Sequence, residues 1–214
     1  MKQLLIGVLL LIVLGIGGLV YRNAVEHPNQ PIACPADAKL CPDGTSVSRI
    51  GLGCEFPACP PPNVTLSDIG IVYAVPDGFA ATEVPDASSV VAYAEPIASS
   101  TDTNRIVIRR YAVDASSTPL SVIQQTAISG TSGQPVGVTA YSSSVINGTR
   151  FTTVSIERFE GVIDTAYYLA RGSDVLRFDA IDAGVADWTD PNLDLSILPA
   201  HAALAKLLAG LELQ

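Results

Sequence analysis

Residues 136–181 read VGVTAYSSSVINGTRFTTVSIERFEGVIDTAYYLARGSDVLRFDAI, and four predicted strands follow one another along them. The dipeptide Asn147-Gly148 separates the first two strands, and between apolar runs it is the strongest short-range signal of a β-hairpin. A turn at Gly172-Ser173-Asp174 separates the last two strands. Strands joined by such short turns pair antiparallel. The segment therefore predicts an antiparallel sheet formed by residues 136–146, 150–159, 162–171 and 175–181.

One face of this predicted sheet is apolar. Within residues 150–159, Val154 and Ile156 alternate with Ser155 and Glu157. Successive side chains of a strand point to opposite faces, so the alternation places the apolar residues together. An antiparallel sheet with one apolar face needs another layer of structure to shield that face from water.

The C-terminal segment supplies a covering helix. Four leucines recur at i, i+3, i+4 and i+7, the spacing of an amphipathic helix: Leu204, Leu207, Leu208 and Leu211. Pro199 suits the first turn of this helix. Because each buried leucine contributes about 1.5–3 kcal/mol, we expect the helix to matter greatly for stability.

Further elements precede these strands. Strands are predicted at Ile69–Val75, Val90–Ala94 and Arg105–Val113, and the first ends at the turn Pro76-Asp77-Gly78. A short helix begins at Thr118-Pro119, with Thr as N-cap and Pro in the first helical position.

The buried face of this short helix is predicted from its apolar spacing. Leu120, Ile123 and Ala127 are expected to share that face. The glycine-rich residues 130–135 form a loop after it.

The order of strands, helix, strands and closing helix predicts an α+β domain: an antiparallel sheet packed by a short helix and a C-terminal amphipathic helix. This order resembles the PsbP-like fold over roughly residues 68–212. The matching stretches are YAVPDGF (73–79), RIVI (105–108), TPLSVI (118–123) and EGVIDTAYYL (160–169). The resemblance implies a non-enzymatic accessory or binding subunit, and it carries over no functional residue.

The N-terminal segment predicts a membrane anchor. Leu4 to Val20 contain only Leu, Ile, Val and Gly, and Tyr21 and Arg22 close the run. Eighteen helical residues span about 27 Å, close to a hydrocarbon core of about 30 Å. Tyr21 suits the membrane interface, and Arg22 can reach the headgroups from the helix end. The charges around the run slightly favour a cytoplasmic N-terminus.

Two alternatives to a retained anchor stay open. A cleaved signal peptide would have a shorter apolar region and a small-x-small cleavage site, which the residues after the run do not offer. A lipoprotein would use Cys34, but Pro31 stands where Leu is usual and Cys34 lies far beyond the apolar run.

All four cysteines lie in one short segment, at Cys34, Cys41, Cys54 and Cys59. An even number of cysteines behind an export segment predicts two disulfides in an oxidising compartment. A segment this short buries too little apolar surface to fold unaided, so cross-links must stabilise it. Zinc is the competing interpretation, but structural zinc sites prefer closer C-x2–4-C pairs. Of the three possible pairings, among which sequence cannot choose, we take Cys34–Cys54 with Cys41–Cys59 as a working hypothesis.

The cysteine segment also resembles two kinds of small module. Its pattern CPDG-x-x-V-x-R…CEF-x-x-C looks like a module of exported bacterial proteins. It loosely resembles antistasin-type inhibitor repeats, although it lacks their full set of cysteines. That resemblance implies a possible inhibitory loop at Thr45–Leu52, with Arg49 in the substrate-like position.

The chain is accordingly divided into five parts. These are a transmembrane anchor (1–22), a linker (23–33), a disulfide-stapled cysteine module (34–59), a Pro-rich linker (60–67) and the α+β PsbP-like domain (68–214). The net charge is −9, from 21 acidic and 12 basic residues, and this repels phosphate backbones. Nucleic acid is therefore not expected as a partner.

No catalytic or cofactor motif stands out. The sequence contains no P-loop and no S-x-x-K, and Gly130-Thr-Ser-Gly133 has the wrong spacing for a serine hydrolase. His201 opens the C-terminal helix, where a surface or cap role is expected. Arg105 and Arg109 share one strand face and could grip an anion, although a solvated edge is the simpler expectation.

The acids near the last strand form the remaining candidate group. Clustered carboxylates with Asn192 could supply ligands to calcium, but their spacing fails the EF-hand pattern. The group is Asp179, Asp182, Asp187, Asp190 and Asp194. We expect them to lie in a solvated loop, with Trp188 as a packing anchor.

These observations favour a non-enzymatic, membrane-anchored, extracytoplasmic binding or assembly protein without a cofactor or metal. The expected location is the cell membrane, with a single span and the bulk of the chain outside the cytoplasm. Its expected partners are the membrane, through the N-terminal helix, and an envelope protein or small ligand. The alternatives are an envelope protease inhibitor acting through the cysteine module and an enzyme of unrecognised type.

Overall fold

The computed structural model describes residues 7, 12–19, 21–22, 34–41, 45–59, 64–97 and 102–214. The chain divides into two compact units. One contains residues 1–37 and 48–57, and the other contains residues 38–47 and 58–214.

Part of the predicted anchor is described, and that part is helical. Gly7 and residues 12–19 and 21–22 have helical backbone. Within the described parts of the chain, no helix is both long enough and apolar enough to cross a membrane. The rest of the Leu4–Val20 run, the linker 23–33 and residues 60–63 of the Pro-rich linker lie outside the described residues, so the anchor and its retention stay predictions.

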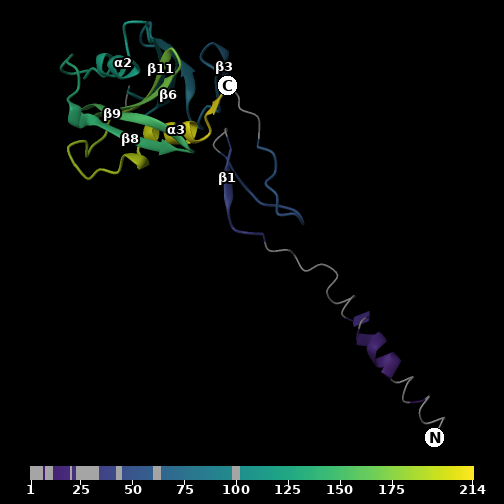
Figure 1. The fold of residues 1–214 in the computed structure, drawn as a ribbon. Helices are drawn as coiled ribbons and strands as arrows, with labels where there is room; N and C mark the ends of the chain where they lie inside the picture. The colour runs from purple at the N-terminus through teal and green to yellow at the C-terminus, as the bar shows by residue number, and fades with distance from the viewer. Residues whose placement is uncertain are drawn as a thin grey trace. The chain divides into compact units, whose positions relative to one another are not determined.

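The larger unit is built on a seven-stranded antiparallel sheet (Figure 1) in the order β5-β6-β7-β11-β10-β9-β8. The strands are β5 (Ala80–Thr82), β6 (Ser89–Pro96), β7 (Thr103–Ala112), β8 (Tyr141–Ile146), β9 (Thr149–Phe159), β10 (Val162–Arg171) and β11 (Asp174–Asp182). The antiparallel sheet predicted from the sequence is confirmed, and β7 joins it beside β11.

The predicted hairpin turn is confirmed in its backbone. Asn147 and Gly148 both have positive φ, 45° and 80°, between β8 and β9. Positive φ at both central residues is what a type I′ turn requires. The strand before it is shorter than the predicted Val136–Ile146, because Val138–Ala140 form a 3-10 turn, η2, ahead of β8.

A second, three-stranded sheet has the order β12-β4-β3. It consists of β3 (Val64–Leu66), β4 (Ile71–Tyr73) and β12 (Glu212–Leu213), of which only β4 was predicted. The predicted strand Ile69–Val75 is shortened because Ser67–Ile69 form the 3-10 turn η1, which ends at Gly70 with φ 57°. Arg171 ties this small sheet to β10, since its Nη1 donates to the carbonyl of Gly70 at 2.6 Å.

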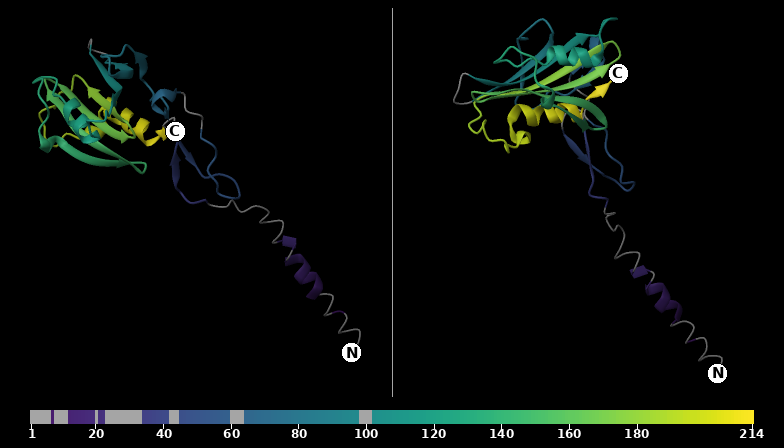
Figure 2. Two further views of the ribbon diagram at one scale, coloured as in Figure 1. Left: turned by 45° about the horizontal axis from the view of Figure 1, so that its top comes forward. Right: turned by 60° about the vertical axis from the view of Figure 1, so that its left-hand side comes forward.

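Helices α2 (Pro119–Thr126) and α3 (Pro199–Ala209) lie on opposite faces of the large sheet (Figure 2). On one face, Leu204, Leu207 and Leu208 of α3 are at most 1% exposed in the larger apolar core, which confirms the amphipathic helix. On the other face, α2 packs on β9, β10 and β11 through a smaller apolar cluster that includes Val154 and Ile156. The expectation that the C-terminal helix covers the face of these two residues is therefore wrong, because α2 covers it.

The start of α2 is as predicted, but one residue of its buried face is not. Thr118 accepts a hydrogen bond from the Ser121 amide at 3.1 Å, and Ser121 Oγ accepts one from the Thr118 amide at 2.9 Å. This reciprocal pair is a capping box. Ile123 and Ala127 are buried as expected, but Leu120 is 59% exposed. Leu120 lies in the first turn on the solvent side, so the buried face is completed by Val122 instead.

The N-terminus of α3 is capped by a side chain from β11. Leu198 precedes the helix and offers no side-chain cap. Instead, Asp182 accepts hydrogen bonds from the amides of Ala200 at 2.7 Å and His201 at 3.2 Å. A carboxylate at this position also interacts favourably with the helix dipole.

The imidazole of His201 extends this contact across the sheet. His201 Nδ1 lies 2.5 Å from an Asp182 oxygen, and Nε2 lies 2.9 Å from Thr165 Oγ1. With the carboxylate ionised, Nδ1 donates to it and Nε2 accepts the threonine proton. His201 is 4% exposed and Asp182 is fully buried, so the predicted surface position of His201 and the solvated position of Asp182 are wrong. A buried carboxylate is tolerated here because three donors satisfy it.

We predict that Asp182→Ala lowers the free energy of unfolding by about 2–4 kcal/mol, because it leaves two helix amides and an imidazole without their acceptor. Urea unfolding followed by Trp188 fluorescence measures this change. Asp187→Ala removes the same charge from an exposed loop residue and should change stability by less than about 0.5 kcal/mol. Equal effects of the two substitutions would contradict the capping role.

Candidate functional site

The α2 face of the sheet carries a cleft of about 360 Å³ beside the small apolar cluster. Strands β7, β9, β10 and β11 form its floor, and the end of α2 with the loop after it forms one wall. Five charged side chains line it: Asp86, Arg109, Glu157, Asp164 and Arg177. All of these residues belong to one compact unit, so the cleft is a feature of the domain itself.

Two arginines at the cleft are already held by a buried acid. Asp179 is fully buried and lies between them. Its Oδ1 accepts from Arg177 Nε at 2.6 Å, and its Oδ2 accepts a hydrogen bond from Arg109 Nη1. Arg109 Nε also donates to Asp86 at 3.1 Å. Both guanidinium groups are therefore committed to partners within the protein.

Arg177 is held further by the end of helix α2. Its Nη1 donates to the carbonyl of Thr126 at 2.7 Å, and its guanidinium carbon lies 5.6 Å from the centre of the Tyr168 ring. The carbonyl of Thr126 is one of the last carbonyls of α2, which carry partial negative charge. This contact joins the wall of the cleft to its floor.

Asp164 of β10 is the least satisfied group in the cleft. Its Oδ1 is buried and has no hydrogen-bond partner among the described residues. Its Oδ2 lies 4.0 Å from Arg177 Nη2, which is an ion-pair distance rather than a hydrogen bond. Burial raises the pKa of Asp164 to about 6, against the attraction of Arg177 and Arg109. The carboxylate of Asp164 therefore has an ion pair with Arg177 but accepts no hydrogen bond from the described residues.

A β-bulge brings a second carboxylate beside it. Asp164 is opposite Glu157, but the next residue, Thr165, is opposite Ser155, so Ile156 is extra. A bulge of this kind re-aims the side chains around it. Glu157 consequently lines the same cleft as Ile156. The strict alternation expected from the sequence would have placed Glu157 on the other face, and that expectation is wrong.

Glu157 differs from Asp164 in that it is well satisfied. Its Oε2 accepts from the amide of Thr131 at 2.6 Å and from Ser129 Oγ at 3.1 Å. Burial acts to raise the pKa of Glu157, but these hydrogen bonds outweigh it and lower that pKa. Two adjacent carboxyl groups are thus driven toward different protonation states.

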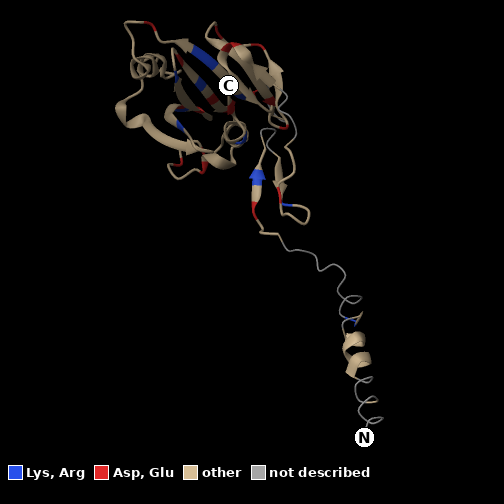
Figure 3. Ribbon diagram, turned by 45° about the vertical axis from the view of Figure 1, so that its right-hand side comes forward, with Lys and Arg blue, Asp and Glu red and all other residues tan. Residues whose placement is uncertain are grey.

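The cleft has an excess of negative charge. Among the described residues, the acids Asp86, Glu157 and Asp164 line it with two bases, Arg109 and Arg177, and the buried Asp179 lies against both arginines. Figure 3 shows basic positions on the central strands, with acidic positions on the same sheet and around its rim. Hydrogen bonds from Ser88 and Arg109 outweigh partial burial and lower the pKa of Asp86 to about 2, so that acid stays ionised. The described residues contain no group of three or more His, Cys, Asp or Glu side chains placed to hold a metal ion.

The five aspartates that the sequence grouped near the last strand lie in two different places in the structure. Asp179 and Asp182 are buried in β11 on opposite faces, so the solvated loop predicted for them is wrong. Asp187, Asp190 and Asp194 lie in the loop after it and are exposed, as predicted. Trp188 packs edge-on against Phe159 with ring centres 5.9 Å apart, which supports its role as an anchor.

The two strand arginines also have different roles. Arg105 is exposed and donates to Thr103 Oγ1 at 3.0 Å. The side chain of Arg109 is only 12% exposed and is bound by acids. The solvated edge predicted for this pair is therefore wrong for Arg109, because β7 lies between β6 and β11 inside the sheet.

The cysteine segment contains two disulfides, Cys34–Cys54 and Cys41–Cys59, which is the pairing of our working hypothesis. In the residues described there is no free cysteine. Two short strands, β1 (Ala38–Leu40) and β2 (Ser46–Ser48), form a two-stranded sheet in this segment. The predicted turn at residues 42–44 lies outside the described residues.

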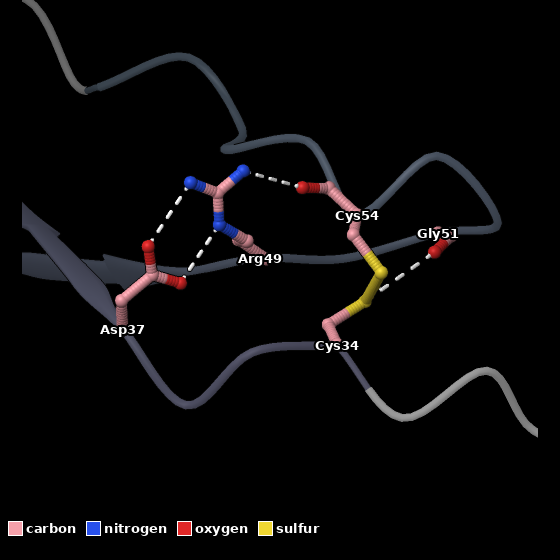
Figure 4. The surroundings of a disulfide bond; sticks show 5 residues. All are labelled: Cys34, Asp37, Arg49, Gly51 and Cys54. Atoms are coloured by element: carbon pink, nitrogen blue, oxygen red, sulfur yellow. Dashed lines mark hydrogen bonds and ion pairs between the residues drawn. A yellow bond between two sulfur atoms is a disulfide. The ribbon is translucent and has the colours of Figure 1, made fainter.

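Arg49 is held inside its loop (Figure 4). Its Nε and Nη2 donate to the two oxygens of Asp37 at 2.7 and 3.0 Å, and Nη1 donates to the carbonyl of Cys54 at 2.9 Å. The guanidinium carbon also lies 4.2 Å from the centre of the Phe56 ring. The hydrogen bond and charge of Arg49 lower the pKa of Asp37, although the Asp37 side chain is 50% exposed to solvent. Arg49 therefore braces the loop closed by the Cys34–Cys54 disulfide and does not project from it.

Sequence reasoning missed Asp164 and Glu157. Asp164 carried one available signal, because it is a charged residue inside the otherwise apolar run Val162–Leu169. Glu157 carried none, since only the register of β9 against β10 reveals the bulge that turns it into the cleft.

Comparison with known proteins gives a distant likeness only. No protein-family model matches the chain, and no curated protein matches it. Among solved structures, it is similar to cyanobacterial PsbP (CyanoP) from Synechocystis sp. PCC 6803, at 13% identity with a TM-score of 0.45, over 71% of this chain and 91% of that one. It is also similar to a protein from Bacteroides thetaiotaomicron at 11% identity with a TM-score of 0.40, over 68% of this chain. The chain spans 45% of the length of the Bacteroides protein. A PsbP-like protein is thus among the structural neighbours, at a similarity that transfers no residue or activity.

We predict that Asp164→Asn stabilises the protein at pH 7.5 and flattens its stability between pH 7.5 and 5. A carboxyl whose pKa is raised on folding binds its proton more tightly when folded, so Asp164 disfavours folding above pH 6. That cost falls as pH drops through 6 toward 3.8, the ordinary pKa of an aspartate. The difference of about two pKa units corresponds to about 3 kcal/mol at most. Urea unfolding at each pH measures this, and a wild-type stability that does not rise on acidification to pH 5 would contradict it.

We predict that the full-length protein does not inhibit trypsin, because the guanidinium of Arg49 is bound to Asp37 and Cys54 instead of being available to a protease pocket. Cleavage after Arg49 should be slow while the disulfides are intact and at least about tenfold faster after reduction. Peptide mapping by mass spectrometry follows the cleavage. Stoichiometric inhibition by the oxidised protein, lost in Arg49→Ala, would restore the inhibitor hypothesis.

Proposed function

We propose that the protein is a non-enzymatic binding or assembly module, exported across a membrane, held there by its N-terminal helix, and bound to its ligand or partner through the α2-side cleft. The observation that carries the binding role is Asp164, a carboxylate at the cleft with a buried oxygen that has no partner. A carboxylate with a buried oxygen that accepts no hydrogen bond is costly to a fold, so its presence in an otherwise well-paired site favours a ligand that interacts with it.

Export is supported by the two disulfides, which form and persist in oxidising compartments. Membrane tethering is supported by the uninterrupted apolar run from Leu4 to Val20. Together they favour a folded domain on the non-cytoplasmic side, joined to the membrane by a short polar linker.

A non-enzymatic role is supported by where the reactive side chains lie. The chain Asp182–His201–Thr165 has the composition of a charge-relay system, but its histidine and threonine are 4% and 6% exposed. Its carboxylate also caps α3. These contacts give the three side chains a structural role.

One observation favours a second candidate function, general acid–base catalysis. Asp164 and Glu157 are cross-strand neighbours whose pKa values are shifted in opposite directions, and such pairs supply the acid and the base in hydrolytic sites. A hydrolytic activity abolished by both Asp164→Asn and Glu157→Gln would favour this function over simple binding.

We predict that the full-length protein stays in the membrane pellet after alkaline carbonate extraction and that its four cysteines react with a maleimide only after reduction. Leu10→Arg, which places a charge within the apolar run, should release a substantial fraction of the protein, because a charge at the centre of a span costs about 2.5–3.5 kcal/mol. Leu10→Val is the matched control and should behave like the wild type. Complete extraction of the wild type, or free thiols without reduction, would overturn the proposed location.

A further inference from the structure

We propose that the α2-side cleft selects a small organic cation, a ligand with a protonated amine or guanidinium group, and that Asp164 accepts its hydrogen bond with Glu157 beside it. This rests on the proposed binding role of the cleft and names the chemical class of the ligand.

The first argument is charge. Two arginines face four acids around the cleft, and each arginine is already in an ion pair with Asp179. An anionic ligand would have to displace Asp179, which is fully buried, or Asp86 from these arginines. A cationic ligand needs no such exchange, because it adds the charge that the cleft lacks.

The second argument is hydrogen bonding. Neither oxygen of Asp164 accepts a hydrogen bond from the described residues, and its side chain keeps 14% of its surface exposed. Glu157, Asp86 and Asp179 each accept at least two hydrogen bonds. An ammonium group brings three donors and a guanidinium group brings five, and neither carries an acceptor atom that would need a donor from the cleft. Either group can therefore donate to the partly exposed carboxylate of Asp164.

The third argument is the lining of the cleft. Apolar side chains, among them Ile156, Val162 and Ile181, line it next to the carboxylates. An alkyl stem can lie along such a wall while its charged end reaches an acid. Tyr111 also lines the cleft, and an aromatic ring is a favourable neighbour for an organic cation. This combination fits an alkylamine better than a small hydrated metal ion.

The test uses the full-length protein in an uncharged detergent, three probes of equal chain length (butylamine, 1-butanol and butanoate) and propylguanidine as a second cation. Calorimetric titration at pH 7.5 should show binding of butylamine, and of propylguanidine, at least about tenfold tighter than either 1-butanol or butanoate. Asp164→Asn should weaken amine binding by about tenfold or more. Asp187→Asn removes one charge from the exposed loop after β11 and should leave amine binding unchanged.

The pH dependence of amine affinity distinguishes binding at Asp164 from nonspecific attraction of the amine to the acidic surface. The groups that face Asp164 are Arg177 and Asp179 on β11, Arg109 on β7 and Glu157 on β9, and His201 lies on the α3 side of the sheet. Because the pKa of Asp164 is raised to about 6, amine affinity should fall about tenfold between pH 7.5 and 5 in the wild type but not in Asp164→Asn.

The possible outcomes are distinct. Equal binding of the three probes, tighter binding of butanoate, or amine binding unaffected by Asp164→Asn would overturn the inference while leaving a binding cleft in place. Failure of all probes to bind would also overturn it. The proposed location of the protein is tested separately by carbonate extraction and thiol labelling, so neither result decides the other.

Discussion

The position of helix α3 depends on one buried carboxylate. Asp182 ends β11 and takes the amides of Ala200 and His201, so it joins the C-terminal helix to a strand in the middle of the sheet. The leucines of α3 bury a large apolar area, but apolar contact has no direction of its own. The hydrogen bonds to Asp182 do have direction, and they set where along the sheet the helix begins. His201 and Thr165 then extend this anchorage to β10.

Strand β11 organises both faces of the sheet, because it carries a buried acid toward each. Asp182 faces α3, where helix amides and an imidazole satisfy it, and Asp179 faces α2, where two arginines satisfy it. Arg177 then reaches the end of α2 through Thr126, so α2 is also tied to this strand. Arg177, which ties α2 to β11, also lines the cleft beside Arg109. The architecture and the candidate site thus share their polar core.

The features that the sequence predicted correctly are those that depend on residues close together in the chain. The Asn147-Gly148 hairpin, the Thr118 cap and the leucine repeat of α3 each follow from a few neighbouring residues, and the structure contains all three. Features that depend on contacts between distant residues could not be predicted. Asp182 looked like a loop residue because its donors lie 18 and 19 positions away, and Arg109 looked exposed because Asp179 is 70 positions away. Glu157 was misplaced because a bulge appears only in the pairing of two strands.

Asp164 shows how stability and binding oppose each other in this domain. The two buried acids, Asp179 and Asp182, have donors for both oxygens, so the fold is able to satisfy buried carboxylates. At Asp164 the fold leaves Oδ1 without a hydrogen bond, and the pKa of this carboxyl is raised. The cleft beside Asp164 has surplus negative charge. A site that contributed only to folding would gain from an asparagine or an apolar residue at this position. A carboxylate that costs stability when the cleft is empty is better explained by a cation that compensates it when the cleft is filled.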